Sequence, residues 1–292
     1  MAEIIQKDGT WSFDGDGVRI VPGSDKGVSL LRRTLGEVTV PLVALAGVAY
    51  EPGRKTGRLR LRLRDGADPL LQVTGGKLDD ASDPYTLTVE TKAAAIAEYF
   101  VDEVRNALLL DSVPTGPVDR YLLPGPSLPM TVSAGDATAG FDGRVVRLEW
   151  TWHTDEAKTS AGPATLAVED LHAVEWLPAR GLVDGHLRFV SSPNAPRVPA
   201  GRDPHAVELN GFKKDPLMAL LAAAVVVRMP HPHAPEPGPA PEPKALGPAP
   251  AAAADDPDAL LRRLRELGEL HQSGILTEEE FTFAKQAVLK RL

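Results

Sequence analysis

The sequence of 292 residues contains no cysteine, and only 5% of its residues are aromatic. The missing cysteines exclude disulfide bonds, cysteine nucleophiles and thiolate-bound metals. Residues 1–8 show neither a basic region nor an apolar region, so we expect no secretory signal. The most apolar run, residues 217–227, is shorter than the ~20 residues that a transmembrane helix needs. We therefore expect a cytoplasmic protein without a transmembrane segment.

Basic residues are also in deficit, with 32 Lys and Arg against 40 Asp and Glu, for a formal net charge of -8. A general nucleic-acid binder shows a basic excess, so we expect no nucleic acid among the partners. The 43% of hydrophobic residues and the 25% of charged residues are normal for a globular protein. The length suits two domains of ordinary size and an accessory segment.

Several motifs occur twice and in the same order. Phe-Asp-Gly stands at residues 13–15 and at residues 141–143, and two residues further on each copy continues with Val-Arg-Ile or Val-Arg-Leu. Asp-Pro followed by Tyr or His stands at residues 83–85 and 203–205. A repeat this long indicates a duplicated domain, because solenoid units are only ~20–50 residues long. The predicted domains are residues 5–112 and residues 133–229.

The first copy begins with strand signals and ends with a helix signal. Short turn-bounded segments rich in Val, Leu and Thr predict strands at residues 38–43, 47–50, 57–64 and 85–89. The Asp-Gly pair at residues 14–15 predicts a hairpin with a type I′ turn. We prefer this turn to a calcium loop, because no ligand carboxylates follow it. Ile96, Phe100, Val104 and Ala107-Leu108 recur at helical spacing, which predicts a helix over residues 91–110.

The second copy repeats this order. The predicted strands are residues 141–152, 164–168, 173–177, 186–190 and 206–209. The helix that follows should begin with Asp215 as N-cap and Pro216 at its first position. Residues 217–229 are apolar nearly all round, so this helix should be buried on more than one side, against the first domain or a partner. The expected fold class is mainly β (α+β), with antiparallel β barrels or sheets each closed by a C-terminal helix.

Beyond the repeats, residues 230–254 form a linker rich in proline and alanine, which predicts a semi-rigid polyproline II tether. Residues 255–292 predict a helical hairpin, in which Gly274 ends the first helix and a Thr277–Glu280 capping box begins the second. About 35 residues are too few for a self-sufficient core, so we expect this segment to form homo-oligomers or to dock on another protein. The residues expected to carry oligomerisation are Leu260, Leu264, Leu267, Phe281 and Val288.

Two resemblances add to these patterns. The segment from Leu260 to Leu292, with Gly-Ile-Leu-Thr-Glu-Glu-Glu-Phe at residues 274–281, resembles the SHOCT (short C-terminal) domain, which implies a tethering or oligomerising appendage on bacterial proteins. The duplicated region is similar to a domain of unknown function that occurs in tandem in actinobacterial proteins. That likeness implies a pleckstrin-homology-like fold, a bent antiparallel barrel capped by one helix, and assigns no catalytic or ligand residues.

The strongest candidate site is the alternating run at residues 58–64. On a strand, the side-chain period of two places Arg58, Arg60, Arg62 and Arg64 on one face and three leucines on the other. The functional interpretation is an anion-binding surface for lipid headgroups, a phosphorylated ligand or an acidic partner. The structural interpretation, which we favour, is a solvated outer face that discourages edge pairing. Only Arg60 has a counterpart in the second copy, Arg188.

Other candidates are weaker. Trp150 and Trp152 should share a face of one strand, and core packing is the favoured role for both and for Trp176. His231 and His233 have no further ligands at metal-binding spacing, so we expect them to be incidental linker residues. Gly-Gly-Lys at residues 75–77 lacks the frame of a phosphate-binding loop.

No catalytic motif is present, so we expect no cofactor, no metal and no enzymatic activity. The expected function is a cytoplasmic binding or scaffold protein in which the C-terminal hairpin joins several chains or recruits them to protein partners. The alternative is a peripheral membrane adaptor that binds anionic lipid through the arginine-rich strand.

Overall fold

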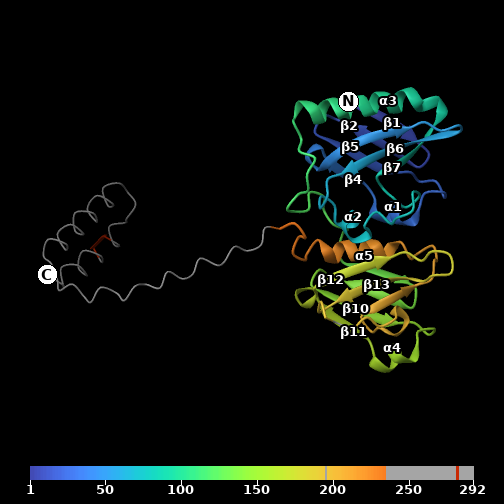
Figure 1. The fold of residues 1–292 in the computed structure, drawn as a ribbon, viewed down its shortest axis with the longest axis vertical. Coiled ribbons are helices and arrows are strands. Elements are labelled where there is room, and N and C mark those ends of the chain that lie inside the picture. The colour runs from blue at the N-terminus through green and yellow to red at the C-terminus, as the bar shows by residue number, and fades with distance from the viewer. Residues whose placement is uncertain (195, 235–280, 283–292) are drawn as a thin grey trace. The chain divides into compact units, whose positions relative to one another are not determined.

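One order of elements is used twice along the chain (Figure 1). The computed structural model describes residues 1–194, 196–234 and 281–282. The first copy contains β1 (Ala2–Gln6), β2 (Gly9–Phe13), β3 (Gly17–Pro22), α1 (Leu30–Leu35), β4 (Val38–Pro41), β5 (Leu45–Glu51), β6 (Thr56–Leu63), α2 (Pro69–Thr74), β7 (Thr86–Glu90) and α3 (Ala94–Leu110). The second contains β8 (Met130–Ala134), β9 (Ala137–Phe141), β10 (Val145–Trp150), α4 (Glu156–Ala161), β11 (Ala164–Ala167), β12 (Ala173–Leu177), β13 (Gly185–Val190), β14 (Ala206–Leu209) and α5 (Leu217–Val226).

Each repeat contains two separate antiparallel sheets. The first has the orders β1-β2-β3-β4 and β5-β6-β7, and the second has β11-β10-β9-β8 and β12-β13-β14. The mainly β (α+β) class is confirmed, but none of these sheets closes into a barrel, so that part of the expectation is wrong. One physical reason is a short 3-10 turn, Leu42–Ala44 in the first repeat and Val168–Asp170 in the second, which ends one sheet before the next begins.

The same hairpin turn joins the second and third strands of each repeat. The Asp14 carboxylate accepts hydrogen bonds from the backbone N–H groups of Asp16 and Gly17, both at 3.0 Å. Asp142 accepts the equivalent bonds at 2.9 and 2.8 Å, and mainly these lower its pKa to about 2. The predicted hairpin at residues 14–15 is confirmed, whereas residues 141–152, predicted as one strand, are the end of β9, a second turn of this kind and β10. Neither turn is type I′. Only the glycine, with φ of 112° at Gly15, has a positive φ, because the aspartate closes the turn with its side chain.

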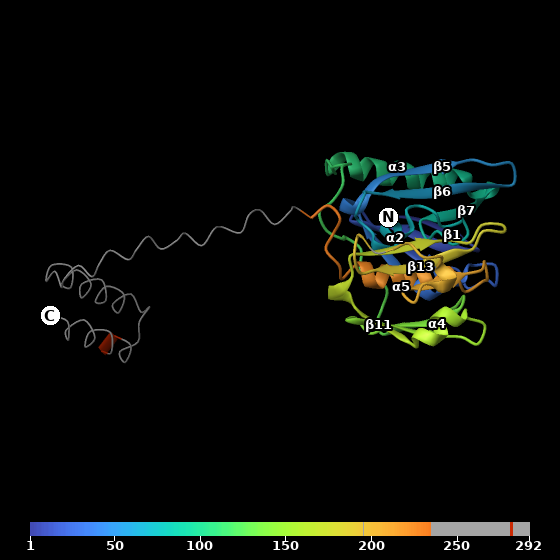
Figure 2. The same ribbon diagram turned by 60° about the horizontal axis from the view of Figure 1, so that its bottom comes forward.

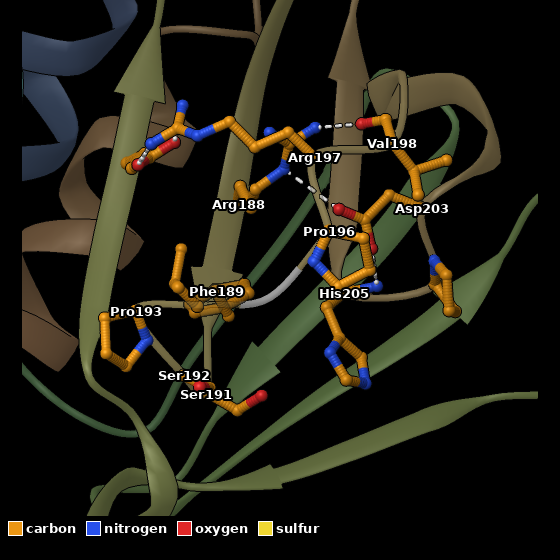
Figure 3. Close-up of a pocket in the computed structure, with 13 residues that line it drawn as sticks. Arg188, Phe189, Ser191, Ser192, Pro193, Pro196, Arg197, Val198, Asp203 and His205 are labelled. Carbon is orange, nitrogen blue, oxygen red and sulfur yellow. Dashed lines mark hydrogen bonds and ion pairs between the residues drawn. The ribbon is translucent and has the colours of Figure 1, made fainter.

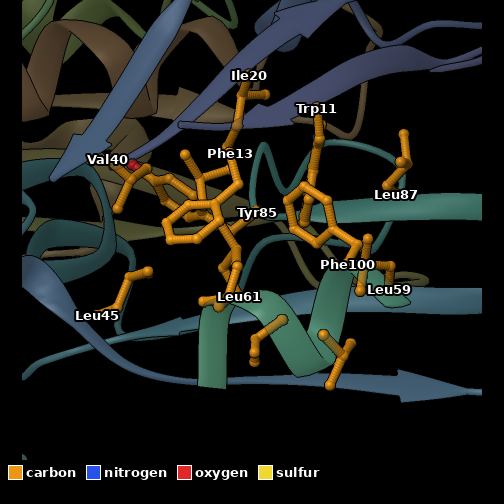
Figure 4. Close-up of a cluster of buried hydrophobic side chains, with 14 of the residues drawn as sticks. Trp11, Phe13, Ile20, Val40, Leu45, Leu59, Leu61, Tyr85, Leu87 and Phe100 are labelled. Carbon is orange, nitrogen blue, oxygen red and sulfur yellow. The ribbon is translucent and has the colours of Figure 1, made fainter. Parts of the chain in front are cut away.

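Helix α3 covers the core of the first repeat (Figure 4). The Phe100 ring packs against the rings of Trp11 and Phe13, with centroids 6.3 and 6.5 Å apart. The predicted helix is confirmed, but Ile96 is 48% exposed, and the fully buried Ala97 takes the inward position. Neighbouring residues of a helix point about 100° apart, so Ile96 falls to the side of the buried stripe.

Helix α5 is buried on several sides, as its composition predicts. Every residue from Met218 to Val225 is buried. It packs on β8, β9 and β12 of its own repeat and on α1 and α2 of the first repeat (Figures 1 and 2). Leu31 and Leu70 of the first repeat belong to the same hydrophobic cluster as this helix. The first repeat keeps a hydrophobic cluster of its own, and the cluster of the second repeat extends into the first through these two leucines, within the unit Met1–Ala234.

The expected N-cap of this helix is wrong. Helix α5 begins after Pro216 without a side-chain cap. The Asp215 carboxylate instead accepts the N–H groups of Gly211 and Phe212, at 2.7 and 3.0 Å, and so holds the preceding loop. The Asp-Pro start signal operates at α2, where Asp68 caps and Pro69 follows.

An ion pair with a buried cation occupies the same place in both repeats. In the second repeat, the Lys158 ammonium of α4 contacts the Asp136 carboxylate of the β8–β9 turn, at 2.5 Å, and the Ala206 carbonyl, at 2.8 Å. The other oxygen of Asp136 accepts the N–H of Glu208 on β14, at 2.8 Å. Lys158 is completely buried. The pair therefore connects the β8–β9 turn of one sheet with β14 of the other sheet, through the short helix α4.

Arg32 and Asp8 make the corresponding pair in the first repeat. The Arg32 guanidinium lies 3.5 Å from the Asp8 carboxylate and donates to the Asp8 carbonyl at 3.1 Å. The same carboxylate accepts the N–H of Thr88 on β7, at 3.1 Å. Arg32 and Lys158 are each the third residue of their helices. The pairing is thus retained although the cation differs.

We expect Lys158→Met to lower the free energy of unfolding by about 3–5 kcal/mol, because it leaves the Asp136 carboxylate buried without its partner. Urea unfolding followed by circular dichroism measures the change. The matched control is Lys92→Met, which removes an exposed partner of Glu90 and should change stability by about 0.5 kcal/mol or less. A loss below about 1 kcal/mol for Lys158→Met would contradict the role assigned to the pair.

Candidate functional site

The arginine run lies on β6, the central strand of the sheet β5-β6-β7. Its side chains alternate between exposed and buried from Thr56 to Leu63, as the sequence predicts. Arg58, Arg60 and Arg62 are exposed, whereas Arg64 follows the end of the strand and is half-buried. The exposed arginines are paired in register with Glu51, Ala49 and Gly47 of β5. Ala49 and Gly47 leave much of this face uncovered because their side chains are small.

The arginines hold different partners. Asp80 bridges two of them, at 2.6 Å from the Arg58 guanidinium and 2.9 Å from that of Arg60. Arg62 donates to the Ala46 carbonyl at 3.4 Å. Asp80 and Glu51 offset part of the charge, so the exposed face of β6 keeps only a small positive excess.

Arg64 has a separate, internal set of acceptors. It donates to the carbonyls of Gly116 at 2.8 Å, Val43 at 3.1 Å and Pro117 at 3.3 Å. Gly116 and Pro117 belong to the segment that joins the two repeats. Arg64 therefore fixes this connection, and the exposed cationic face consists of the other three arginines.

The second repeat has a cavity of about 320 Å³ beside β12 and β13 (Figure 3). Arg188, the counterpart of Arg60, lies in it with its guanidinium 2.9 Å from the Asp203 carboxylate and 2.5 Å from the Val198 carbonyl. Arg197 pairs with Glu175 at 2.8 Å. Both carboxylates that line this cavity are thus held by arginines. The cavity offers a ligand a partly apolar wall, and it does not offer a free pair of carboxylates for acid–base chemistry.

The tryptophans of the second repeat do not form one surface. Trp176 is buried in the core, as expected. Trp150 donates from its indole N–H to the Gly162 carbonyl at 2.7 Å, and its ring lies 5.0 Å from the Lys158 ammonium. Trp152 is 95% exposed, so its expected core role is wrong. Strand β10 ends at Trp150, and the two residues therefore do not share a strand face.

The histidines at the start of the predicted linker contact the first repeat. His231 bonds through Nε2 to the Gly66 carbonyl at 2.9 Å, and its ring packs on Tyr121 with centroids 4.6 Å apart. His233 lies 3.0 Å from the Asp65 carboxylate. The expectation that these histidines are incidental is wrong, because they fix the chain that leaves α5 on the β6–α2 loop. Within the described part of the chain, no cluster of three His, Asp or Glu side chains suits a metal ion.

Asp68 is a buried carboxylate at the start of α2, the helix that contacts α5. It accepts the N–H groups of Leu70 and Leu71, at 3.2 and 3.0 Å, and the hydroxyl of Tyr85 at 2.9 Å. Burial raises the pKa of Asp68 to about 6 in spite of these bonds. Sequence reasoning missed this residue, although Asp-Pro at residues 68–69 is a helix start signal.

We expect the native protein to lose stability relative to Asp68→Asn as the pH rises from about 4 to about 6. The folded state holds the Asp68 proton up to a pKa of about 6, whereas the unfolded chain releases it near 3.8, so a rising pH favours unfolding. At about 1.4 kcal/mol for each pKa unit, the loss approaches about 3 kcal/mol. Urea unfolding of both proteins across this range measures it. The exposed variant Asp25→Asn serves as the control, and a difference between native protein and Asp68→Asn that stays constant with pH would contradict the expectation.

Four of the five predicted oligomerisation residues, Leu260, Leu264, Leu267 and Val288, lie outside the described residues. Phe281 is described, and it is helical and half-buried. None of the helices in the described part of the chain has the length and apolar character needed to cross a membrane.

Comparison with known proteins identifies both parts of the chain. The family model described as "Domain of unknown function (DUF4429)" matches two tandem segments, residues 11–105 and 139–226. The model described as "Short C-terminal domain" (SHOCT) matches residues 262–289. No curated protein matches the sequence.

Proposed function

The chain belongs to the DUF4429 family through its two tandem repeats and carries a C-terminal SHOCT segment, and from this premise we propose that it is a non-catalytic binding scaffold. The double repeat supplies the binding surfaces, and residues 255–292 join several chains or recruit them to protein partners. We also propose a cytoplasmic location. The proposed relation to the pleckstrin-homology fold is supported by the strand order and the closing helix of each repeat.

The observation that carries the proposal is the hydrophobic contact between the two repeats at α5. Leu31 and Leu70 of the first repeat pack into the cluster that surrounds α5 of the second. The repeats therefore present their surfaces in one fixed arrangement. A second contact between joined chains is intramolecular, so weak surfaces of this kind gain affinity from avidity without any new contact.

We expect the chain that ends at residue 254 to have the mass of one protomer and the full chain to have a multiple of it. The physical reason is that residues 255–292 are too short to bury their leucines alone. Multi-angle light scattering measures both masses. Leu264→Ser with Leu267→Ser should lower the mass of the full chain, whereas the control Leu110→Ser, at a leucine of α3 that is 84% exposed, should not. Equal masses per chain with and without residues 255–292 would exclude self-association through this segment.

A second candidate function is contact with anionic lipid through β6. It is supported by the exposure of Arg58, Arg60 and Arg62 beside Gly47 and Ala49, which leave room for headgroups. The proximity of Asp80 weakens it.

If β6 is a lipid site, changing Arg58, Arg60 and Arg62 to Gln should lower the partition coefficient of the full chain on phosphatidylserine vesicles by about a hundredfold, since each cation near an anionic surface contributes about 1 kcal/mol. Unchanged sedimentation removes this candidate. Arg33→Gln, an exposed arginine of α1, is the control.

A further inference from the structure

One end of the second repeat exposes large apolar side chains. Leu182 is 103% exposed, Val183 is 71% exposed and Phe212 is 69% exposed. Leu182 and Val183 lie on the loop between β12 and β13, and Phe212 lies on the loop between β14 and α5. We call these three residues, with the basic residues beside them, Arg180, Lys213 and Lys214, the apolar tip.

The two loops of the apolar tip lie side by side. Gly185, which begins β13, is in register with Leu209, which ends β14. The Asn210 side chain donates to the Asp184 carboxylate at 3.2 Å. A side chain added at Gly211 would contact Ala179, with 3.6 Å between the two Cβ atoms. The exposed residues of both loops therefore belong to one end of the sheet β12-β13-β14.

The charges of the apolar tip are mainly basic. Arg180, Lys213 and Lys214 are all exposed. Of the nearby acids, Asp215 is buried and bonded to the N–H groups of Gly211 and Phe212, whereas Asp184 is exposed, accepts from the neutral Asn210 side chain and offsets one of the three cations. The surface around Phe212 is thus cationic, although the whole chain carries a net charge of -8.

The fold does not require these apolar residues. The first repeat makes the same end with Pro-Gly-Arg-Lys at residues 52–55, between β5 and β6, and with Thr91 and Lys92 after β7. Residues 52–55 are all exposed, and none of them is a large apolar residue. The comparison within one chain shows that exposed Leu and Phe at this end of the sheet are a particular property of the second repeat.

We propose that the apolar tip is a membrane contact, in which Leu182 and Phe212 enter the interface of an anionic bilayer while Arg180, Lys213 and Lys214 bind its headgroups. The side chains stand on loops and are not set in a groove, so a deformable lipid surface covers both at once. Cations around an apolar centre complement negative lipids. The proposal goes beyond the scaffold function and does not require β6 to bind lipid.

The test measures co-sedimentation of the full chain with two kinds of vesicle. One kind is phosphatidylcholine alone, and the other contains about one third phosphatidylserine. We expect co-sedimentation with the anionic vesicles that weakens as salt is raised. Leu182→Ser with Phe212→Ser should lower the partition coefficient by about tenfold or more, because two apolar side chains no longer leave water. Lys213→Gln with Lys214→Gln should lower it as well and should reduce its dependence on salt.

The matched control is Leu109→Ser with Leu110→Ser, which removes two leucines that are 76% and 84% exposed at the end of α3. All variants keep residues 255–292, the segment proposed to join the chains, and thermal unfolding checks that each remains folded. No binding by the native chain, or equal binding by native and tip variants, overturns the proposal. It is also overturned if only the β6 arginine variants lose binding. A change in the mass of the protein in solution, without vesicles, on substitution of the tip residues would likewise overturn it, because the tip would then contact a second copy of the chain.

Discussion

The burial of α5 is the constraint on which the arrangement of the two repeats depends. A helix without a polar face must be covered all round, and the sheets of a single repeat cover only part of it. Leu31 of α1 and Leu70 of α2 supply the remaining cover from the first repeat. Two further contacts reinforce this one. Arg64 holds the segment between the repeats, and His231 holds the chain that leaves the helix. Duplication alone would give two tethered domains, whereas the apolar helix gives one unit.

The two repeats show which features the fold needs and which are free to change. Both keep the aspartate-closed hairpin and the ion pair, with its buried cation, between the first turn, the short helix and the last strand. The ion pair joins two sheets that share no strand pairing, which explains its retention with either arginine or lysine as cation. The long loop before the last strand differs, because it forms α2 in the first repeat and only a short 3-10 turn, Ala200–Arg202, in the second.

Sequence patterns predicted what depends on local periodicity. The duplication, most of the strands, both closing helices and the alternation of β6 follow from residue spacing, whereas β1, β8 and the short helices α1, α2 and α4 were not predicted. What they missed depends on tertiary contacts. Asp215 resembles a helix cap, but its carboxylate bonds to the preceding loop. Trp152 follows an apolar alternation, but its strand has already ended. The partners of Lys158 come from residues 136 and 206, which no local pattern places beside it. An alignment of the two repeats is the signal that finds this pair, since each copy has an aspartate in its first turn and a cation in its short helix.

The proposed membrane contact and the proposed oligomerisation depend on each other energetically. Two apolar side chains and three cations bind a bilayer only weakly, since even a single myristoyl chain gives marginal, reversible attachment. A scaffold that joins several double repeats through residues 255–292 would present several tips to one surface, and each further contact would then be intramolecular. Membrane residence would in this way depend on the assembly state and not on the single chain. The fixed contact at α5 contributes to this coupling, because two repeats that moved independently of each other would lose orientational entropy at every contact.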